Sequence, residues 1–527
     1  MSDSGSRTLV VGTRGSALAL WQADFLEAEL AKAGYKTTRK IIKTVGDRVQ
    51  DRSFSQMPGV GFFTAEIQEA LLRGDIDIAV HSHKDLPTQS PEGLVVAAVS
   101  ERADPSDSLI VKPEAIDRRF TLDLKQGARV GTSSVRRRIQ LAAYRPDLQI
   151  EDLRGNVPTR IEAVRSGHLD ATVLASAGLD RLNANLDGLV RIRLLPDRFI
   201  PAAAQGVLAF ECRRGDQDAL EALGKIHHEP TSWAIRAERN MLANLRAGCQ
   251  APFGAYCHYD TGLFHFRVLI GDTEAPEQVP WRFSTEAPDP DILVVESWGR
   301  YKGRRPKSVF VSRELGEDSL FVRAMKDHSI QWQAESLMTF DPMEFEWPKQ
   351  NPHWIFFSSR TAVRRFAERM PDGLSEVKYG AIGDGTARTM RNHGMEPDYI
   401  AEPRDLDADL SAFAGQVKGQ RIVFPGAERG LRTAQKALEG SAEIIDIAVY
   451  RNQPKASFEV QRPDIAVMTS PMNARTYLEH YPERKMDKFV AIGSSTESAL
   501  KEAGARRVTR AHRPAEMSLL EALFSAR

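Results

Sequence analysis

Short apolar runs alternate with helical patterns through the first half of the 527-residue chain. Residues 9–11 form an apolar run, and residues 17–32 then repeat apolar side chains at helical spacing until Gly34 ends the pattern. Further apolar runs are centred on residues 76–80, 94–99, 130, 173–174 and 207–209. Such alternation is typical of open α/β layers with mostly parallel sheets. The sequence therefore predicts an α/β fold for this half.

Polar residues cluster where three of these predicted strands end. They are the segments 13–16 (Thr-Arg-Gly-Ser), 81–85 (His-Ser-His-Lys-Asp) and 131–134 (Gly-Thr-Ser-Ser). In open α/β sheets, ligands bind beyond the carboxyl ends of the strands. Lys84 and Asp85 form either a surface ion pair or a catalytic pair in which the carboxylate acts as acid, base or electrostatic stabiliser. We therefore expect a ligand site at these strand ends.

Arginine is concentrated in residues 129–165, which carry eight arginines and four acidic residues. We expect Ser133 or Ser134 to cap a helix that begins near Val135. The free N–H groups of that helix, together with the guanidinium groups, would bind an anion. Arginine favours bidentate binding of carboxylates or phosphates. The alternatives are a solvated basic helix face and a nucleic-acid site, which the scarcity of aromatic residues disfavours.

The overall charge and the cysteines limit the class of protein. Lysines and arginines number 71, as do aspartates and glutamates, so bulk charge gives no reason to expect a nucleic-acid or membrane partner. No apolar run approaches about 18 residues, and the first residues lack the apolar core of a secretory signal. The three cysteines, Cys212, Cys249 and Cys257, are too few for a disulfide framework, so we expect a cytoplasmic protein.

The pattern changes near residue 230. A predicted helix at 233–245 leads to a loop around Cys249, and a β-rich stretch follows, with residues 264–270 as its clearest strand. Cys249 is either a modifiable loop thiol or a small buried side chain, whereas we expect Cys212 and Cys257 to be buried. The polar, basic segment 297–307 is interpreted as a linker to the second half.

The second half contains an internal repeat. Residues 381–386 (Ala-Ile-Gly-Asp-Gly-Thr) and 491–496 (Ala-Ile-Gly-Ser-Ser-Thr), at an offset of 110 residues, are each followed by a helical run. The repeat predicts two related α/β lobes with parallel sheets, and two unrelated strand–helix turns are the alternative. This half shows no metal-ligand spacing and no nucleophile–base pair.

Residues 1–302 resemble the porphobilinogen deaminase (hydroxymethylbilane synthase) family. Six motifs carry the resemblance: 12–22 (Gly-Thr-Arg-Gly-Ser-Ala-Leu-Ala-Leu-Trp-Gln), 79–87 (Ala-Val-His-Ser-His-Lys-Asp-Leu-Pro), 131–137 (Gly-Thr-Ser-Ser-Val-Arg-Arg), 153–160 (Leu-Arg-Gly-Asn-Val-Pro-Thr-Arg), 201–206 (Pro-Ala-Ala-Ala-Gln-Gly) and 247–254 (Ala-Gly-Cys-Gln-Ala-Pro-Phe-Gly). The resemblance implies two α/β lobes like those of a periplasmic binding protein, at about residues 1–105 with 203–228 and at 106–202. It also implies a small α+β domain at 229–302 that carries the cofactor.

The resemblance further implies roles for individual residues. Cys249 carries a dipyrromethane cofactor through a thioether, and Asp85 is the catalytic carboxylate for joining four porphobilinogens into hydroxymethylbilane with loss of ammonia. The residues implied to bind the cofactor are Lys84, Asp85, Ser134, Arg136, Arg137 and Arg154. Those implied to bind substrate are Arg14, Ser16, Arg154, Arg160 and Arg181. In the loop 54–63 the family usually has two lysines where this chain has Gln56 and Val60, so we expect an active deaminase with altered substrate holding or loop closure.

Residues 306–527 resemble the uroporphyrinogen-III synthase family. The motifs are 354–359 (Trp-Ile-Phe-Phe-Ser-Ser), 381–386, 423–426 (Val-Phe-Pro-Gly), 449–450 (Val-Tyr), 469–471 (Thr-Ser-Pro) and 491–496. The resemblance implies two lobes, at about 306–342 with 453–527 and at about 345–450, that hold the bilane while its last ring is inverted and the macrocycle closes. Tyr450 matches the residue that assists departure of the hydroxyl group. Thr386, Ser470 and Thr496 match polar substrate-binding positions, with a helix cap as the alternative role for each hydroxyl.

Together the resemblances predict a monomeric, cytoplasmic enzyme of heme and tetrapyrrole biosynthesis with a transferase half and a lyase half. Its substrates would be porphobilinogen and hydroxymethylbilane, its cofactor dipyrromethane, and it would need no metal, nucleic acid or membrane. One alternative is an active deaminase fused to a catalytically degenerate synthase. The other is a non-enzymatic polycarboxylate-binding protein, which would give Cys249 no role.

Overall fold

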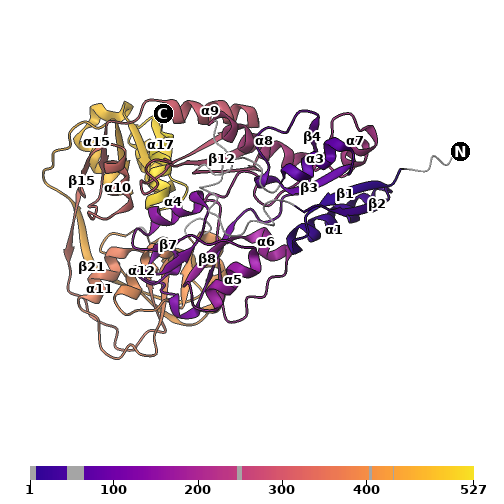
Figure 1. Ribbon diagram of the computed structural model, residues 1–527. Helices are drawn as coiled ribbons and strands as arrows, with labels where there is room; N and C mark the ends of the chain where they lie inside the picture. Colours follow the sequence, from indigo (N-terminus) through magenta and orange to yellow (C-terminus); the bar gives the residue numbers. More distant parts are fainter. Residues whose placement is uncertain (1–6, 44–63, 246–251, 403–405, 431, 527) are drawn as a thin grey trace. The chain divides into compact units, whose positions relative to one another are not determined.

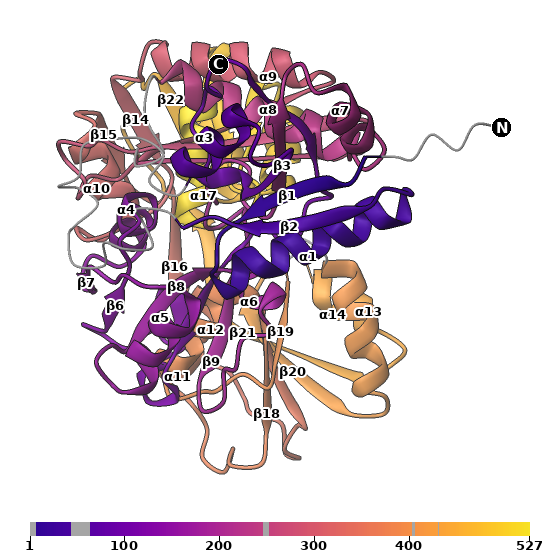
Figure 2. The ribbon, with the colours of Figure 1, turned by 45° about the vertical axis from the view of Figure 1, so that its right-hand side comes forward.

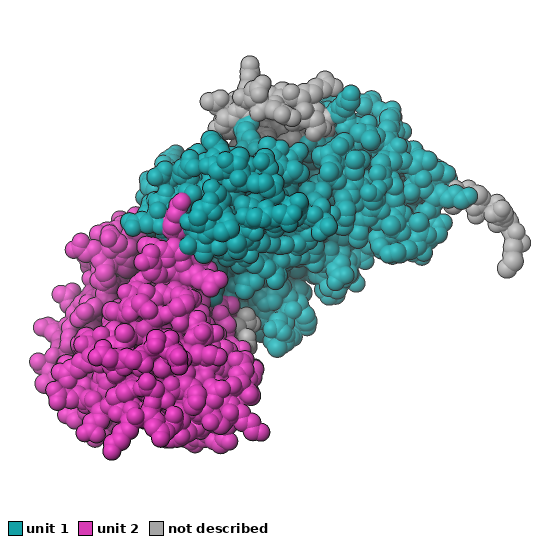
Figure 3. All heavy atoms as spheres, turned by 90° about the horizontal axis from the view of Figure 1, so that it is seen from below, with its two compact units in different colours: residues 1–116, 126–304 teal, residues 117–125, 305–527 magenta. Residues whose placement is uncertain are grey.

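The computed structural model describes residues 7–43, 64–245, 252–402, 406–430 and 432–526. The chain forms two compact units, residues 1–116 with 126–304 and residues 117–125 with 305–527 (Figure 3). Within the described ranges, no helix is both long enough and apolar enough to cross a lipid bilayer.

The first unit contains two five-stranded sheets (Figure 1). The first sheet has the order β2 (Thr37–Ile41), β1 (Leu9–Thr13), β3 (Ile78–Ser82), β10 (Leu208–Arg213) and β4 (Leu94–Val99). The second has the order β7 (Gln149–Glu151), β6 (Arg129–Gly131), β8 (Ala171–Ala175), β5 (Asp107–Val111) and β9 (Val190–Leu194). In each sheet one strand, β10 or β5, runs antiparallel to both of its neighbours.

The chain crosses between these two sheets twice, so the pair forms a two-lobed α/β structure. Residues 100–106 lead from β4 to β5, and residues 195–207 lead from β9 back to β10. Because β10 lies between β3 and β4, the second crossover passes beside the end of β3, where the backbone N–H of His83 donates to the carbonyl of Val207 at 2.9 Å. The predicted two-lobed α/β fold is confirmed for this half.

Helices follow the strands of both sheets and cover their faces. Those of the first lobe are α1 (Ala17–Lys32), α3 (Ala65–Arg73) and α7 (Gln217–Gly224), and those of the second are α4 (Val135–Tyr144), α5 (Val157–Arg165) and α6 (Ser176–Arg181). Short 3₁₀ turns lie at η2 (His83–Asp85) and η3 (Pro113–Ala115), whereas the turn η4 (Thr121–Asp123) belongs to the second unit. In the first lobe Leu26 and Leu30 of α1 pack with Val11 and Phe210 in one fully buried cluster.

The first unit ends in a small α+β part. Its antiparallel sheet consists of β11 (Phe253–Asp260), β12 (Leu263–Ile270) and β13 (Trp281–Ala287), and it packs with α8 (Glu229–Asn244) and α9 (Pro290–Lys302). The interpretation of residues 297–307 as a linker is wrong for residues 297–302, which are helical. Their polar character belongs to the solvent-facing side of α9, while Leu293 and Ser297 are buried.

The second unit also contains two sheets. One has the order β15 (Gln331–Ala334), β14 (Ser308–Val311), β22 (Ile465–Met468), β23 (Lys488–Ala491) and β24 (Arg507–Arg510), and all its pairings are parallel. The other has the order β16 (Met338–Pro342), β21 (Glu443–Pro454), β20 (Arg421–Ala427), β17 (Trp354–Phe357), β18 (Lys378–Ile382) and β19 (Tyr399–Ala401). Only the edge strand β16 pairs antiparallel in it.

The helices of the second unit complete two lobes with mostly parallel sheets, as predicted. One lobe has α10 (Leu320–Asp327), α15 (Pro471–His480), α16 (Ser494–Glu502) and α17 (Glu516–Ser525), and the other has α11 (Arg360–Ala367), α12 (Gly383–Asn392), α13 (Leu406–Gln416) and α14 (Thr433–Leu438). Helices α13 and α14 lie together and pack apolar side chains against the second sheet (Figure 2). The predicted repeat corresponds to β18 with α12 and β23 with α16.

Candidate active sites

The first strand end of the first unit shapes the start of helix α1. The hydroxyl of the buried Thr13 donates to the carbonyl of Ala19 at 2.9 Å, and the Ser16 hydroxyl accepts from the N–H of Ala19 at 3.3 Å. Ser16 is thus the N-cap of α1. This cap gives Ser16 a structural role, and substrate binding by Arg14 and Ser16 stays a prediction.

The second strand end carries the Lys84–Asp85 pair on the turn η2. Asp85 is exposed and Lys84 is half-buried, and the Lys84 ammonium donates to Oε1 of Gln205 at 3.3 Å. Burial lowers the pKa of Lys84 to about 8, although the nearby carboxylates of Asp85 and Asp107 act in the opposite direction. The lysine is therefore mostly cationic at pH 7 and lies beside an exposed carboxylate.

His83 takes no part in proton transfer near neutral pH. Its side chain is buried, and burial, reinforced by the charge of Arg239, lowers its pKa to about 3. The imidazole is therefore neutral over the physiological range. The other ionisable groups on η2 are Lys84 and Asp85, and the catalytic role of Asp85 stays a prediction.

Arg136 and Arg137 of helix α4 meet a buried carboxylate, Asp107, at the start of β5. Arg136 Nη1 lies 2.8 Å from Asp107 Oδ2, and Arg137 Nη2 lies 2.7 Å from Asp107 Oδ1. Burial alone would raise the pKa of Asp107, but the two guanidiniums hold it well below its usual range. The pair thus forms a fixed cationic centre whose charge Asp107 only half neutralises.

Asp107 was not anticipated from the sequence. Its only local signal is a carboxylate that begins an apolar run at residues 107–111. A buried charge needs partners, and these partners lie 29 and 30 residues away.

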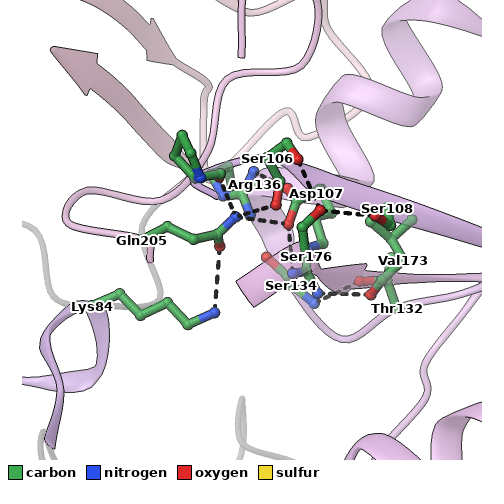
Figure 4. A network of polar contacts seen from close by, with 12 residues as sticks. Lys84, Ser106, Asp107, Ser108, Thr132, Ser134, Arg136, Val173, Ser176 and Gln205 are labelled. Carbon is green, nitrogen blue, oxygen red and sulfur yellow. Dashed lines mark hydrogen bonds and ion pairs between the residues drawn. The ribbon is translucent and has the colours of Figure 1, made fainter. Parts of the chain in front are cut away.

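Gln205 connects Lys84 with Asp107 (Figure 4). Its Nε2 donates to Asp107 Oδ1 at 3.0 Å, while its Oε1 accepts from Lys84. Lys84 belongs to the first lobe and Asp107 to the second, so a side chain of the second crossover touches both lobes. The sequence placed Gln205 in a motif without assigning it a role.

Two further predicted arginines, Arg160 and Arg181, are partly buried and donate to backbone carbonyls. Arg160 Nε donates to the carbonyl of Gly155 at 2.9 Å, and Arg181 Nη2 donates to that of Gly206 at 2.8 Å. The pKa of each guanidinium is lowered to about 10, by burial in Arg181 and by burial together with the charges of Arg137 and Arg154 in Arg160. Both cations therefore remain protonated at pH 7, and the repulsion of Arg160 by Arg137 and Arg154 favours an anionic ligand among these three.

Two of these guanidiniums have an unused donor. The Nε atoms of Arg137 and Arg181 are buried and have no hydrogen-bond partner among the residues that the structure describes. A buried donor without an acceptor is costly, and a carboxylate that accepts from it removes the cost. The donor set thus fits a ligand that carries several carboxylates, as each pyrrole of a dipyrromethane does.

The expected cap of helix α4 is only half right. The helix begins at Val135 and Ser134 occupies the N-cap position, but the Ser134 side chain makes no capping hydrogen bond. Instead the backbone N–H of Ser134 donates to the hydroxyl of Thr132 at 3.2 Å (Figure 4). Thr132 therefore organises this turn, and the role of Ser134 in cofactor binding stays a prediction.

Cys212 and Cys257 are buried, as predicted, and are unsuited to covalent chemistry. Burial raises the pKa of Cys212 to about 11 and raises that of Cys257 further above its usual value. Neither thiol supplies a thiolate at pH 7. Cys249, Gln56 and Val60 lie outside the described residues.

The second unit places Tyr450 on strand β21 in an apolar setting. Tyr450 is buried, the ring of Phe340 meets it edge-on at 6.0 Å between centroids, and its side chain hydrogen-bonds with that of Ser359. Burial raises the pKa of the phenol, and the hydrogen bond to Ser359 opposes that shift. Tyr450 is therefore a neutral phenol at pH 7 that can donate a proton or a hydrogen bond.

The three predicted hydroxyls of this unit have different surroundings. Thr386 is buried in the first turn of α12, in the same lobe as Tyr450. Ser470 lies in the other lobe and caps α15, since its oxygen accepts from the N–H of Asn473 at 3.1 Å. Thr496, in the first turn of α16, is buried and its hydroxyl has no partner within the described part of the chain. For Ser470 the capping alternative is thus observed, and substrate binding by all three stays a prediction.

Sequence reasoning missed the ion pairs near the strand ends of the second unit. Arg313 follows β14 and contacts Glu516 of α17 at 2.6 Å. Arg513 contacts Glu402 at 3.1 Å, and these two residues belong to different lobes. The sequence motifs pointed to hydroxyl side chains, whereas the cationic side chains of Arg313 and Arg513 also lie near these strand ends.

Comparisons with known proteins divide the chain in the same way. Residues 9–221 match the family model "Porphobilinogen deaminase, dipyromethane cofactor binding domain", residues 233–286 match "Porphobilinogen deaminase, C-terminal domain", and residues 321–521 match "Uroporphyrinogen-III synthase HemD". A porphobilinogen deaminase of Chloroherpeton thalassium is 41% identical over 283 residues, which are 53% of this chain and 88% of the relative. That of Pelobacter propionicus is 47% identical over 275 residues, covering 52% of this chain and 86% of the relative.

Solved structures similar to parts of the chain have low identity. Uroporphyrinogen-III synthetase from Helicobacter pylori is 16% identical with a TM-score of 0.32 and covers 41% of this chain and 97% of its own. The periplasmic VFT2 domain of Bordetella pertussis BvgS is 15% identical with a TM-score of 0.28 and covers 42% of this chain and 88% of its own.

Proposed function

The chain belongs to the porphobilinogen deaminase family through its first half and carries a uroporphyrinogen-III synthase domain in its second, and from this premise we propose how its residues divide the work. The first half joins four porphobilinogens into hydroxymethylbilane and releases ammonia. The second half closes the bilane, with inversion of the last ring, to uroporphyrinogen III. The observation that supports the residue assignment best is the buried guanidinium of Arg137, which has an unused donor and lies close enough to Lys84 to act on its charge.

In the deaminase half, Asp85 moves the protons. Its carboxyl protonates the amine that leaves as ammonia, and as a carboxylate it stabilises the cationic azafulvene that remains. It then takes up the proton that the attacking pyrrole carbon loses when the new carbon–carbon bond forms. Lys84 lies beside it and is mostly cationic at pH 7.

The arginines hold the carboxylate side groups. We assign cofactor binding to Lys84, Asp85, Ser134, Arg136, Arg137 and Arg154, and substrate binding to Arg14, Ser16, Arg154, Arg160 and Arg181. Cys249 would hold the dipyrromethane through its sulfur, and the bound group would supply a covalent anchor for the growing chain of pyrroles. The Nε atoms of Arg137 and Arg181 supply two donors for its carboxylates or those of the substrate.

The anchor can be tested by the intact mass of the denatured full-length protein. We expect a mass excess of one dipyrromethane that maps to the peptide containing Cys249 and disappears in Cys249→Ala. Purified, active protein with a bare thiol at this position would contradict the assignment.

In the synthase half, Tyr450 assists departure of the terminal hydroxyl group as water. The neutral phenol donates its proton to the leaving oxygen, and Ser359 holds the phenol in place. Thr386, Ser470 and Thr496 bind polar groups of the bilane so that the inverting attack on the last ring is the nearest one. The protein thereby directs ring closure by geometry.

Incubation of the full-length chain with porphobilinogen separates this proposal from its alternatives. We expect uroporphyrinogen III as the main product. Formation of isomer I alone would indicate an inactive second half, and absence of any porphyrinogen would indicate a binding protein.

We further propose domain boundaries and a setting for the enzyme. The deaminase spans residues 1–302, with lobes at about 1–105 with 203–228 and at 106–202 and a cofactor-carrying domain at 229–302. The synthase spans residues 306–527, with lobes at about 306–342 with 453–527 and at 345–450. The balanced charge and the three cysteines favour a cytoplasmic protein without nucleic-acid or membrane partners, and we propose that it is a monomer. Sedimentation of the purified chain would test the monomer.

A further inference from the structure

We propose that Gln205 is a positioning residue of the deaminase, which fixes the Lys84 ammonium, next to Asp85 in the sequence, relative to the arginine-bound carboxylate of Asp107. This inference rests on the proposed deaminase function of the first half. It assigns Gln205 no contact with substrate, because its polar atoms are already taken by protein groups.

The Gln205 carboxamide is buried and all its polar atoms have partners. Its relative exposure is 1%. Nε2 donates to the carbonyl of Pro105 at 2.8 Å, to that of Ser106 at 3.3 Å and to Asp107 Oδ1 at 3.0 Å, while Oε1 accepts from Lys84 at 3.3 Å (Figure 4). The side chain thus joins the first crossover, at residues 105–106, to one ionisable group in each lobe.

The polarity of these contacts allows only one orientation of the amide. The amide nitrogen faces three acceptors, and a flipped amide would direct its oxygen at two carbonyls and a carboxylate. The amide oxygen must therefore face Lys84. Because Asp107 is itself held by Arg136 and Arg137, the position of the oxygen is set by the arginine cluster of the second lobe.

The backbone around Gln205 is also held in a special conformation. Ala204 has φ +59° and Gly206 has φ +90°, so both flanking residues are left-handed. A Cβ atom on Gly206 would lie 2.7 Å from the carbonyl oxygen of Ala103. A non-glycine residue in this region costs free energy, and such strain is maintained where the surroundings determine the conformation. The main chain thus presents the Gln205 side chain at one place.

The charges around Lys84 make its environment sensitive to this contact. Asp85, Asp107, Arg136 and Arg137 are the charged groups that act on it. Burial lowers the pKa of Lys84 to about 8, and loss of a hydrogen-bond acceptor would lower it further because the ammonium would lose stabilisation. A lysine that must be charged for activity loses its charge as the pH rises through its pKa, so the alkaline limb of the rate profile reports on Gln205.

The test compares Gln205→Met and Gln205→Glu in the full-length, cofactor-loaded protein. We expect Gln205→Met to lower kcat for ammonia release by about ten- to a hundredfold, as for loss of a hydrogen bond to a charged group, and to move the alkaline limb to lower pH. In Gln205→Glu, the new carboxyl lies beside Asp107 and keeps a proton, since two adjacent carboxylates do not both ionise readily. It can then donate to Asp107 and accept from Lys84, so activity near about pH 6 should be largely restored and then fall earlier than in the wild type as the pH rises.

Gln140→Met is the matched control. Gln140 is also buried and also holds the second crossover, with Nε2 donating to the carbonyl of Ile200 at 3.0 Å and Oε1 accepting from its N–H at 2.8 Å. Its Nε2 also donates to the carbonyl of Arg136 at 3.3 Å, and none of these bonds involves Lys84 or Asp107. This variant should therefore lose stability but keep the alkaline limb of the wild type.

The outcomes are distinct. An unchanged alkaline limb in Gln205→Met, or equal losses in Gln205→Met and Gln205→Glu at all pH values, would overturn the inference. Wild-type protein that releases no ammonia from porphobilinogen would instead refute the proposed function itself.

Discussion

At the scale of single residues, the first unit depends on a few buried charges that compensate one another. Asp107 is fully buried and accepts from Arg136, Arg137 and Gln205. Removing one partner of a buried ion pair leaves the other charges without compensation, which costs more than the pair itself contributes. The same arrangement keeps the two guanidiniums in fixed positions, where they can receive carboxylates without reorganisation.

Asp107→Asn should therefore lower the free energy of unfolding of the first unit by about 3–5 kcal/mol, measured by urea denaturation. Asp152→Asn is the control, because Asp152 pairs at 3.0 Å with the neighbouring Arg138 but is largely exposed. Asp152→Asn should lower the free energy of unfolding by at most about 1 kcal/mol. Equal losses in the two variants would show that burial of Asp107 is unimportant.

The pH dependence of this effect has a definite sign. The folded-state pKa of Asp107 is held below its unfolded value, so the stability it contributes is present above about pH 4 and is lost as the pH falls through the folded-state pKa. The difference in unfolding free energy between wild type and Asp107→Asn should therefore be constant near neutrality and shrink in acid. A difference that stayed constant down to the acid transition would contradict the assigned ion pairs.

At the scale of elements, serine side chains cap helices that begin near both candidate sites. Ser16 caps α1, Ser359 caps α11 and Ser470 caps α15, and each helix directly follows a strand end. A capping hydroxyl therefore stabilises its helix whether or not it also takes part in binding or catalysis. Ser359 is the member of this group that also contacts a predicted catalytic side chain, Tyr450.

Substitution of Ser359 tests two roles separately, the cap of helix α11 and the contact with Tyr450. Ser359→Ala should lower stability by about 1 kcal/mol through loss of the α11 cap. It should also reduce formation of uroporphyrinogen III from hydroxymethylbilane, because Tyr450 loses its hydrogen-bond partner. Ser319→Ala is the matched control, since Ser319 caps the equally short helix α10 by accepting from Val322 N at 3.2 Å. If both variants cyclised the bilane equally well, the contact between Ser359 and Tyr450 would have no role in catalysis.

At the scale of the whole molecule, two compact units each contain their own sheets and apolar clusters. Each unit buries enough apolar surface to unfold as a cooperative body. The two enzymatic steps can therefore be altered independently by substitutions in one unit or the other.

Calorimetry should accordingly resolve two thermal transitions. Asp107→Asn should lower the Tm of one transition by several degrees, and Ser359→Ala should lower the Tm of the other by a smaller amount. A single transition that both substitutions shift equally would mean that the units unfold as one body.

The sequence by itself determined the features that depend on residues close together in the chain. Helix starts at Ala17 and Val135, the repeat of strand and helix at residues 381 and 491, and the adjacency of Lys84 and Asp85 all follow from local patterns of apolar, capping and glycine residues. The order of the sequence motifs also indicated the two protein families. The α/β class followed because alternating strands and helices bury their apolar faces in only a few layered arrangements.

Only the tertiary structure decided which distant residues meet. Arg136 contacts Asp107, which is 29 residues away in the sequence, and Lys84 contacts Gln205, which is 121 residues away. These contacts arise because β10 inserts between β3 and β4 and β5 inserts between β8 and β9, which brings both crossovers to the ends of the strands. Sheet order and strand register result from the packing of all elements together, so no local window of sequence contains them.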